Sequence, residues 1–509
     1  MSTTSRASTV DGVLRRSAAK FPDRTALRFA DRTWTYSELD RAVSRAAGLL
    51  RSLGLQTGDR VAAYGTNSDA YVIGFLACAR GGLIHVPVNY ALKEGELSYL
   101  ISNSGSRVVL VDPALRPNLA AITDALDIEQ VLTLRDEAGS LLAHTIGGEI
   151  PTIDETVDET DLVQLLYTSG TTSKPKGAMM THGAMVHEYV SSVIALSFTE
   201  NDNPLIAMPL YHSAGMHVFM LPYLSVGATV SLMETPAIPE ILRRIEEEKI
   251  GSLFLAPTVW VPLAGHPDLE TRDLSSLTKA QYGASIMPVT VLNRLRERYP
   301  AIKFYNCFGQ SEIGPLATVL QPEDHEDRPA SCGKAVFFVE TRVVDTEGND
   351  VPDGTAGEVL YRSPQLCQGY WDNPEATDEA FRDGWFHSGD LVTRDSEGYI
   401  TVVDRIKDVI NTGGILVASR EVEDAIYTHP AVAEVAVVGT PDEKWIEAIT
   451  AVVVLRDDAD EIGEQVLIAH VKERIAPFKV PKRVVFVDEL PRNQSGKLLK
   501  RELRSGLQD

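Results

Sequence analysis

The sequence predicts an α/β protein with a large N-terminal domain of parallel-rich sheets covered by helices and a small mobile C-terminal α+β domain. Strand-like apolar runs alternate with helical stretches up to about residue 400, a pattern that predicts parallel sheets with helices on their faces. Beyond Tyr399 the pattern changes to a compact unit with its own helices and strands. The length of 509 residues is ample for a large core, and 44% hydrophobic with 23% charged residues is typical of globular proteins.

The apolar runs that stop at turn residues predict the strands of the first domain, and the stretches between them predict its helices. These strands are expected at residues 60–64, 83–88, 108–112 and 253–257, with a helix that reaches Ala79. In the C-terminal part, helices are expected at residues 419–429 and 464–475, and strands at 434–438, 449–455 and 484–487. We place the domains at 1–404 and 405–509, with a short hinge near Lys407.

The charge balance excludes some classes of function. The chain has 48 basic and 71 acidic residues and a net charge of -23, which argues against general binding of nucleic acid or of anionic membranes. The four cysteines (Cys78, Cys307, Cys332, Cys367) lack the spacing of a zinc or disulfide framework. Residues 1–15 have no signal-peptide core, and no apolar run spans a bilayer. We therefore expect a cytoplasmic protein without a transmembrane segment, with a homodimer left open.

The segment 165–177 (LLYTSGTTSKPKG) is the most informative part of the chain. It reads as a buried strand that ends in a loop of hydroxyls, glycine and lysines, which can donate hydrogen bonds to phosphate oxygens. It is not a Walker A loop, because the order of glycine, lysine and hydroxyl differs. A solvated turn is the alternative. The candidate phosphate-binding residues are Thr168, Ser169, Gly170, Thr171, Thr172 and Lys176.

Two further segments combine small residues, an aromatic ring and a carboxylate. Residues 282–285 (YGAS) place small side chains where a flat ring could lie against the backbone, and residues 305–312 (YNCFGQSE) follow. Mg²⁺ prefers one or two carboxylates together with phosphate oxygens, so Glu312 alone is chemically sufficient. A strand-to-helix turn capped by Ser311 is the alternative.

Other polar positions are ambiguous when each is taken alone. A lone histidine beside an aromatic residue is usually structural. His212 stands at the end of an apolar strand with serine and glycine nearby, which makes a ligand-facing role the alternative. Asp390 could accept hydrogen bonds from ribose hydroxyls, and Arg405 offers planar donors. Lys497 lies in a polar turn, where a solvated lysine is the default interpretation.

In this order the motifs resemble the adenylate-forming superfamily, which includes acyl-CoA synthetases, adenylation domains of nonribosomal peptide synthetases and beetle luciferases. The resemblance extends from residues 24–27 (RTAL) and 34–39 (WTYSEL) to Lys497. Residues 369–375 (GYWDNPE), 389–390 (GD) and 441–445 (PDEKW) are most similar to bacterial fatty-acyl-CoA synthetases.

The resemblance implies two half-reactions. A carboxylate attacks the α-phosphate of ATP and releases pyrophosphate, and the thiol of CoA then attacks the acyl-adenylate. It implies that residues 168–176 bind the β- and γ-phosphates, that Ser311 contacts the α-phosphate, and that Glu312 holds Mg²⁺. It also implies that Asp390 and Arg405 bind the ribose and that Lys497 bridges carboxylate and α-phosphate. Gly283, Ala284 and Phe308 would hold the adenine, and Ser285, Asn306 and Gly309 are further candidates for binding the nucleotide.

The same resemblance implies a C-terminal domain that rotates between the half-reactions. Lys407 matches the hinge, Gly413 and Gly414 match the loop of the pantetheine tunnel, and Trp445 lies where relatives contact the CoA nucleotide. His212 matches a residue near the acyl carbonyl. The acyl pocket is expected to be lined by segments after His212, at residues 254–260 and at 282–288.

Several positions depart from the family. Ser173 stands where glycine is usual, Ser311 replaces threonine, Ser419 stands where proline is usual, and Ile446 follows Trp445 where glycine is usual. The last two put the acceptor in doubt. We therefore expect an ATP-dependent acyl-CoA ligase for a medium- or long-chain fatty acid, ahead of an aryl acid. Transfer to a carrier protein and nitrite-activating diazotisation remain alternatives; a nucleotide sensor is disfavoured because Lys497 and Glu312 are both present.

We predict that Lys497→Ala slows adenylation by roughly 10² to 10³, the usual effect of removing one preorganised charge-stabilising donor. Thioester formation from supplied acyl-adenylate is expected to be largely unaffected. Measuring pyrophosphate release and thioester formation separately tests the assignment, and equal damage to both steps would refute it.

Overall fold

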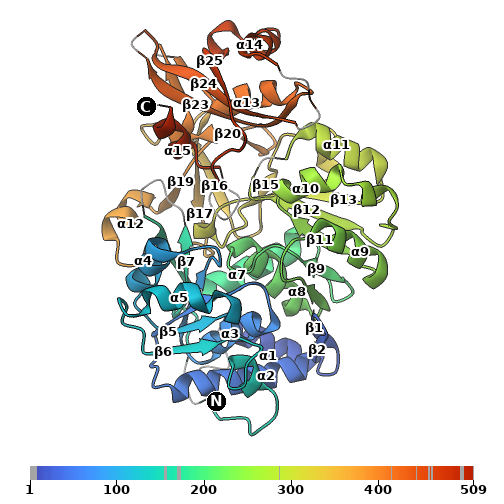
Figure 1. The fold of residues 1–509 in the computed structure, drawn as a ribbon, viewed down its shortest axis with the longest axis vertical. Helices are drawn as coiled ribbons and strands as arrows, with labels where there is room; N and C mark the ends of the chain where they lie inside the picture. Colours follow the sequence, from blue (N-terminus) through green and yellow to red (C-terminus); the bar gives the residue numbers. More distant parts are fainter. Residues whose placement is uncertain are drawn as a thin grey trace. The chain divides into compact units, whose positions relative to one another are not determined.

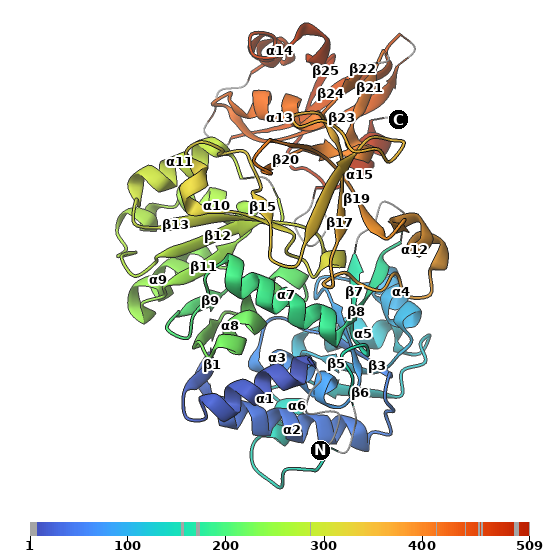
Figure 2. The ribbon, with the colours of Figure 1, turned by 180° about the vertical axis from the view of Figure 1, so that it is seen from behind.

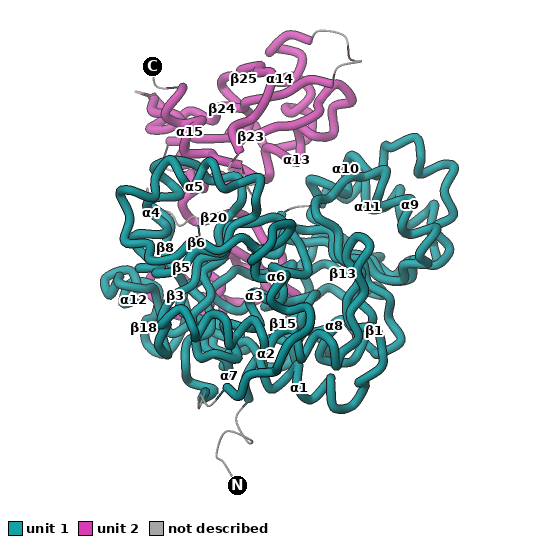
Figure 3. Tube along the Cα trace, turned by 60° about the horizontal axis from the view of Figure 1, so that its bottom comes forward, with its two compact units in different colours: residues 1–341, 361–387 teal, residues 342–360, 388–509 magenta. Residues whose placement is uncertain are grey.

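The structure is a computed structural model whose elements run from α1 (Val10–Lys20) to α15 (Lys500–Gly506) (Figure 1). It describes residues 8–153, 157–168, 174–285, 287–413, 415–442, 444–456, 459, 462–492 and 498–507. The chain divides into two compact units, residues 1–341 with 361–387 and residues 342–360 with 388–509 (Figure 3). These units differ from the predicted domains, since residues 342–360 and 388–404 fall with the C-terminal unit. A hinge concerns movement rather than contacts in one structure, so the hinge near Lys407 stays a prediction.

The first unit contains two sheets in which most neighbouring strands are parallel. One sheet has the order β6-β5-β3-β4-β7-β8, with only the β7–β8 pair antiparallel. Its strands are β3 (Arg60–Tyr64), β4 (Ile84–Val88), β5 (Ser106–Val111), β6 (Gln130–Thr133), β7 (Leu162–Thr168) and β8 (Lys176–Thr181).

The other sheet of this unit has the order β15-β14-β13-β12-β11-β9-β10-β1-β2 and is parallel from β13 to β1. Its strands are β1 (Thr25–Phe29), β2 (Arg32–Thr35), β9 (Pro204–Ile206), β10 (Val230–Leu232), β11 (Ser252–Leu255), β12 (Lys279–Gly283), β13 (Lys303–Phe308), β14 (Thr318–Leu320) and β15 (Lys334–Ala335). The predicted parallel-rich α/β architecture is confirmed.

Helices cover the sheets, and polar caps define several of their starts. Thr35 and Glu38 form a capping box at the start of α2, and Thr181 caps α7. Helix α7 packs against α8 and the π-helix η3 (Figure 2). The helices of this unit after α1 are α2 (Tyr36–Ser52), α3 (Asp69–Arg80), α4 (Glu94–Ser104), α5 (Arg116–Thr123), α6 (Leu141–Thr145), α7 (His182–Ala195), η3 (Ala214–Met220), α8 (Leu221–Val226), α9 (Ile238–Glu248), α10 (Pro257–Ala264), α11 (Val289–Arg298) and α12 (Pro374–Ala380).

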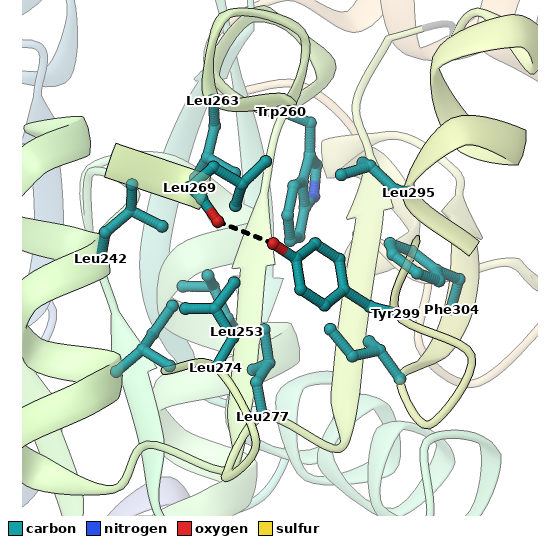
Figure 4. Close-up of a pocket in the computed structure, with 12 residues that line it drawn as sticks. Leu242, Leu253, Trp260, Leu263, Leu269, Leu274, Leu277, Leu295, Tyr299 and Phe304 are labelled. Carbon is teal, nitrogen blue, oxygen red and sulfur yellow. Dashed lines mark hydrogen bonds between the residues drawn. The ribbon is translucent and has the colours of Figure 1, made fainter. Parts of the chain in front are cut away.

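Helices α9, α10 and α11 bury their apolar faces against β11, β12 and β13 in one core cluster. A small cavity of about 10 Å³ lies within this cluster, lined by leucines and aromatic rings (Figure 4). Trp260 lines this cavity and donates its indole N–H to the carbonyl of Gln281 (3.0 Å), while the Tyr299 hydroxyl donates to the carbonyl of Leu269 (2.8 Å). The cavity is apolar and barely water-sized, so it is a packing defect of the core rather than a substrate site.

A third sheet has the order β16-β17-β19-β18, with β20 beside β19. It contains β16 (Glu340–Val344), β17 (Gly357–Arg362), β18 (Phe381–Arg382), β19 (Trp385–Arg394) and β20 (Ile400–Arg405). The last sheet has the order β22-β21-β24-β23, with β25 beside β24. It contains β21 (Ile410–Thr412), β22 (Ile415–Val417), β23 (Val432–Asp442), β24 (Ile446–Leu455) and β25 (Arg483–Phe486), with helices α13 (Ser419–Tyr427), α14 (Glu464–Lys472) and α15. The predicted α+β character of the C-terminal part is confirmed.

No helix in the described part of the chain is long and apolar enough to cross a membrane. The four cysteines are buried and carry free thiols.

A buried polar chain connects four elements of the first unit. Tyr189 on α7 donates to Nδ1 of His217 on η3 (3.0 Å), and Nε2 of His217 contacts the amide oxygen of Gln164 on β7 (2.6 Å). The amide nitrogen of Gln164 contacts Nδ1 of His85 on β4 (3.0 Å). Burial lowers the pKa of both His85 and His217 to about 3. Both imidazoles therefore stay neutral in the folded protein at neutral pH.

We predict that the free energy of unfolding falls as pH falls from 7 to 5. Below the ordinary histidine pKa near 6.5 the unfolded chain takes up protons that buried His85 and His217 do not, so stability present above that pH is lost progressively down to about pH 3. Each site contributes about 2 kcal/mol between pH 6.5 and 5. Urea unfolding at several pH values should show a smaller decline for His85→Gln. Exposed His144 is the matched control, and His144→Gln should decline like the parent; the same decline in both variants contradicts the assignment.

Candidate active site

The predicted phosphate-binding loop joins two antiparallel neighbours of one sheet. Strand β7 ends at Thr168 and β8 begins at Lys176, and these two residues face each other in the pairing register. The ammonium of Lys176 lies 5.1 Å from the ring centre of Tyr370. Both hairpin ends therefore present a polar group at the same edge of the sheet, while the predicted loop residues Ser169, Gly170, Thr171 and Thr172 lie outside the described residues.

In the first unit, candidate site residues from distant parts of the sequence contact one buried carboxylate. Glu312 lies on the short 3-10 helix η5 (Ser311–Ile313) and is only 7% exposed. Its Oε1 accepts hydrogen bonds from the Thr168 hydroxyl (3.2 Å) and from the Tyr370 hydroxyl (3.0 Å). Three distant parts of the sequence thus converge on one oxygen, and the predicted pair of Thr168 and Glu312 is in direct contact.

Tyr370 is a site residue that sequence reasoning missed. Burial raises the pKa of its phenol, with a further contribution from the charge of Glu312. The phenol therefore remains a protonated donor to the carboxylate throughout the working pH range. Its one signal in the sequence is its place after Gly369, in the segment 369–375 that is similar to bacterial fatty-acyl-CoA synthetases.

The backbone around Glu312 is held by a second buried network. Gln365 donates through its amide nitrogen to Oε2 of Glu188 on α7 (2.6 Å) and to the carbonyls of Ile313 (3.2 Å) and Leu316 (3.1 Å). Cys367 donates its N–H to the carbonyl of Glu312 (2.8 Å). Burial raises the pKa of Glu188 well above its ordinary value. Gln365 and Glu188 carried no sequence signal, because their role depends on long-range packing.

The predicted acyl-site histidine connects to the same region through two serines. Ser213, next to His212, shares a hydrogen bond with Ser311 (Oγ–Oγ 2.9 Å). The ring of Tyr211 lies 4.3 Å from that of His212. Burial lowers the pKa of His212 to about 4. His212 is therefore a neutral imidazole at pH 7, suited to hydrogen bonding rather than to carrying charge.

Asn67 fixes the chain that leads into His212. Its amide nitrogen donates to the carbonyls of Met208 (3.0 Å) and Met233 (2.9 Å), and its amide oxygen accepts the N–H of Leu210 (2.7 Å). Asn67 is buried at the end of β3. A single side chain thus anchors the segment between β9 and η3, which the sequence analysis did not identify.

The segments predicted to hold adenine are adjacent in space. Strands β12 and β13 pair in parallel with Gly283 opposite Cys307, so residues 284–285 and 308–309 follow at the same sheet edge. A Cβ on Gly283 would lie 2.1 Å from the Cys307 carbonyl oxygen, which requires glycine there. Ala284 and Ser285 are exposed and Phe308 is half-buried. Asn306 instead donates to the carbonyl of Ser331 (2.9 Å).

Gly309, directly after β13, is also a position where close backbone approach requires glycine. Its φ is +154°, and a Cβ would lie 2.0 Å from the carbonyl oxygen of Pro315. The position needs glycine because the backbone of residues 309 and 315 approaches so closely.

The predicted ribose-binding residues form a pair within the second unit. Asp390 on β19 faces Arg405 on β20 in the antiparallel register, and Nε of Arg405 lies 2.7 Å from Oδ1 of Asp390. A tight turn lies at residues 383–384 between β18 and β19, and Asp390 is inside the strand. Because strand pairing fixes the backbone of both residues, the pair presents a carboxylate and a guanidinium in fixed relation.

The predicted hinge and CoA residues also belong to this unit. Burial lowers the pKa of Lys407 on η7 (Ile406–Asp408). Gly413 (φ +64°) donates its N–H to the carbonyl of Trp445 (2.5 Å), and the ammonium groups of Lys444 and Lys482 lie 4.8 and 5.1 Å from the Trp445 ring centre. Gly414 and Lys497 lie outside the described residues.

The donor set fits Mg²⁺ better than a transition metal. The described residues contain no group of three histidine, cysteine or acidic side chains that could hold a metal ion. Mg²⁺ needs only one or two protein carboxylates when phosphate oxygens and water complete its shell. Glu312 satisfies this requirement, and the Thr168 and Tyr370 hydroxyls both donate to its Oε1.

The architecture and the polar strand ends define an adenylate-forming enzyme, and the comparisons agree. The model of the AMP-binding enzyme family matches residues 14–371, and that of the AMP-binding enzyme C-terminal domain matches residues 421–497. The chain therefore belongs to the AMP-binding enzyme family. It is an AMP-forming ligase of the acyl-CoA synthetase class.

The curated relatives include acyl-CoA ligases for different acids. A feruloyl-CoA synthase of an Amycolatopsis species is 38% identical over 96% of this chain and 97% of its own length. An indoleacetate–CoA ligase of Aromatoleum aromaticum is 34% identical, with 96% of each chain covered. A medium/long-chain-fatty-acid–CoA ligase of Mycobacterium tuberculosis is also 34% identical, over 95% of this chain and 87% of its own length.

The solved structure of ATP-bound MatB from Rhodopseudomonas palustris is similar over the whole chain. It superposes with a TM-score of 0.90 at 31% identity and covers 98% of this chain and 99% of MatB.

We predict that Tyr370→Phe lowers kcat/KM for ATP by about tenfold, because a hydrogen bond to a charged group contributes roughly 1.5–3 kcal/mol. Glu312 would lose one of its two donors, so the apparent requirement for Mg²⁺ should rise as well. Pyrophosphate release measured over a magnesium series, together with calorimetric binding of Mg·ATP, checks both effects.

The matched control is Tyr299→Phe, which removes a phenol bonded to a neutral carbonyl in the remote core. It should leave both measurements at the parent level. Parent-like ATP kinetics and magnesium dependence in Tyr370→Phe would mean that the Glu312 hydrogen bond is irrelevant to nucleotide binding.

Proposed function

We propose that this AMP-forming ligase activates an aryl acid as its acyl-adenylate and transfers the acyl group to CoA. One oxygen of the acid's carboxylate attacks the α-phosphorus of ATP, and the bond to pyrophosphate breaks. The CoA thiol then attacks the acyl carbonyl, loses its proton, and expels AMP. Both steps redistribute charge without a covalent protein intermediate, so positioning and electrostatic stabilisation by this chain's side chains carry catalysis.

The proposed roles are those that the resemblance to the family implies for the residues of each unit. In the first unit, Thr168, Lys176 and the loop between them bind the terminal phosphates, and Ser311 contacts the α-phosphate. Residues 283–285 and 306–309 hold the adenine. In the second unit, Asp390 accepts from the ribose hydroxyls and Arg405 orients that carboxylate. Lys497 is assigned to the attack on the α-phosphate and Trp445, Gly413 and Gly414 to CoA, with a rotation about Lys407 between the two steps.

Mg²⁺ would be held by Glu312, and when bound it would neutralise charge on the phosphate oxygens. The chain itself contributes the orientation of that carboxylate. Thr168 and Tyr370 fix it from two sides, and Gln365 holds the backbone that carries it.

The packing beyond His212 supports an aryl rather than a long aliphatic substrate. Phe219 on η3 stacks on Phe254 at the end of β11, with ring centres 4.3 Å apart and an interplanar angle of 16°. Both rings are at least 93% buried, and Met216 and Met220 on the same helix are fully buried. Further ring contacts join Tyr211 to Tyr90 and to His212. The acyl pocket is expected along these segments. A flat acid would then need only a slot beside the rings, whereas a long chain would have to displace the stacked phenylalanines.

This stacked pair is the observation that carries the choice of substrate class. The names of the Amycolatopsis and Aromatoleum relatives, both ligases of ring-containing acids, agree with it. A medium- or long-chain fatty acid is the second candidate, favoured by the similarity to the Mycobacterium tuberculosis ligase. The cytoplasmic location and the homodimer remain predictions.

We expect kcat/KM for hydroxycinnamic or indole-containing acids to exceed that for C8–C16 fatty acids by about 10², because each misfit in an apolar pocket costs ten- to two-hundred-fold. Pyrophosphate release and thioester formation, followed with and without CoA, measure both steps for each acid. A preference for the fatty acids would contradict the aryl-acid proposal and support the second candidate, a medium- or long-chain fatty acid.

Phe254→Leu tests the structural reason for this preference. Shortening this ring should raise relative kcat/KM for medium-chain acids about tenfold. Phe386→Leu shortens another buried ring, one paired with Phe381, and should leave the ratio between acids unaltered. If Phe254→Leu also leaves that ratio unaltered, the stacked rings do not set the substrate class.

A further inference from the structure

One buried serine connects the two sides of the predicted hinge. Ser419, the first residue of α13, is fully buried. Its N–H and its hydroxyl both donate to Oδ2 of Asp404, at 2.6 and 2.8 Å. Asp404 precedes Lys407 and Ser419 follows it, so these hydrogen bonds span the hinge within the second unit.

The serine hydroxyl also accepts a hydrogen bond from the C-terminal helix. Nζ of Lys500, the first residue of α15, donates to Oγ of Ser419 (2.6 Å) and lies 2.7 Å from Oε1 of Glu423. The side chains of Lys500 and Glu423 are 14% and 12% exposed. Ser419 therefore links the carboxylate of Asp404 to the ammonium of Lys500, and we call this chain of hydrogen bonds the relay. The serine hydroxyl must donate to Asp404 and accept from Lys500, because an ammonium can only donate and a carboxylate only accepts.

The relay also fixes the backbone of neighbouring site residues. Oδ1 of Asp404 accepts the N–H of Arg405 (2.7 Å), and Arg405 pairs with Asp390. Arg504 on α15 donates to Oδ1 of Asp408 (2.8 Å) and to the carbonyl of Lys407 (3.4 Å). The strand that carries Arg405 and the helix that begins three residues after Lys497 are thus held to each other through Asp404, Ser419 and Lys500.

We propose that Ser419 is a positioning residue for adenylation: it holds the hinge strand with Arg405 and the start of α15 in one arrangement. This inference rests on the proposed two-step function. Because the relay crosses the hinge, rotation about Lys407 would have to break or distort it. The relay therefore stabilises the arrangement that holds Arg405 close to the start of α15, the arrangement proposed for adenylation. It opposes the rotation that would separate them.

A graded series of substitutions at position 419 separates the contribution of the serine hydroxyl from that of its backbone N–H. Ser419→Ala removes the hydroxyl and should slow adenylation about tenfold, equivalent to about 1.4 kcal/mol. Ser419→Pro removes both donors and should slow it further; proline suits the first helical position, and the extended conformation of Ala418 (φ -67°, ψ 122°) suits a residue before proline. Ser419→Thr keeps both donors and should behave like the parent.

Single-turnover measurements compare acyl-adenylate formation with thioester formation from supplied acyl-adenylate. The second step is expected to change less than twofold, because it needs departure from the relayed arrangement. Thr440→Val, which removes a buried hydroxyl bonded to Thr450, is the matched control and should affect neither step. Equal slowing of both steps, or a threonine variant as slow as alanine, overturns the proposal.

Amide hydrogen exchange tests the relay without turnover. Residues 400–408 should exchange faster in Ser419→Ala and Ser419→Pro than in the parent and in Thr440→Val. Unchanged exchange overturns the relay even if the kinetics differ. If the parent forms no acyl-adenylate with any acid while exchange responds as expected, the proposed function fails and the relay stands.

Discussion

The site in the first unit depends on the burial of one carboxylate. An isolated carboxylate in a protein interior is strongly disfavoured unless it is hydrogen-bonded or paired. Glu312 meets this requirement through Thr168 and Tyr370, which come from segments 144 and 58 residues away in sequence. The positions of β7, η5 and the chain after Gly369 are therefore linked, because misplacing any of them would leave a buried charge without its donors.

The rigid parts of the fold bring these short segments together. Parallel strands end at one edge of a sheet, so β12 and β13 place residues 284–285 and 308–309 side by side. The hydrogen bonds of Gln365 to the carbonyls of Ile313 and Leu316 extend this order to the turn that follows Glu312. Polar groups buried behind the site thus position groups that face the ligand.

Much of the fold could be predicted because local patterns determine it. The strand expected at 60–64 is β3 without change, and the helix expected at 419–429 is α13, shorter by two residues at its end. Thr168 and Glu312 could be identified singly from their chemistry, but their contact depends on how two sheet edges meet. Tyr370, Glu188 and Gln365 could not be identified, because a tyrosine, a glutamate and a glutamine acquire these roles only from distant partners.

Two departures from the family show how structure changes the interpretation of sequence. Ser419 has a clear physical account: proline could supply neither its N–H nor its hydroxyl to Asp404, and Lys500 would lose an acceptor. Ile446 has φ +68° and is 59% exposed, a conformation that strains a β-branched residue by about 1–3 kcal/mol; nothing in the structure explains it. Local rules are usually broken where function or a compensating contact requires it. Ser419 has that contact, and its hydrogen bonds to Asp404 and Lys500 link residues on both sides of the predicted hinge.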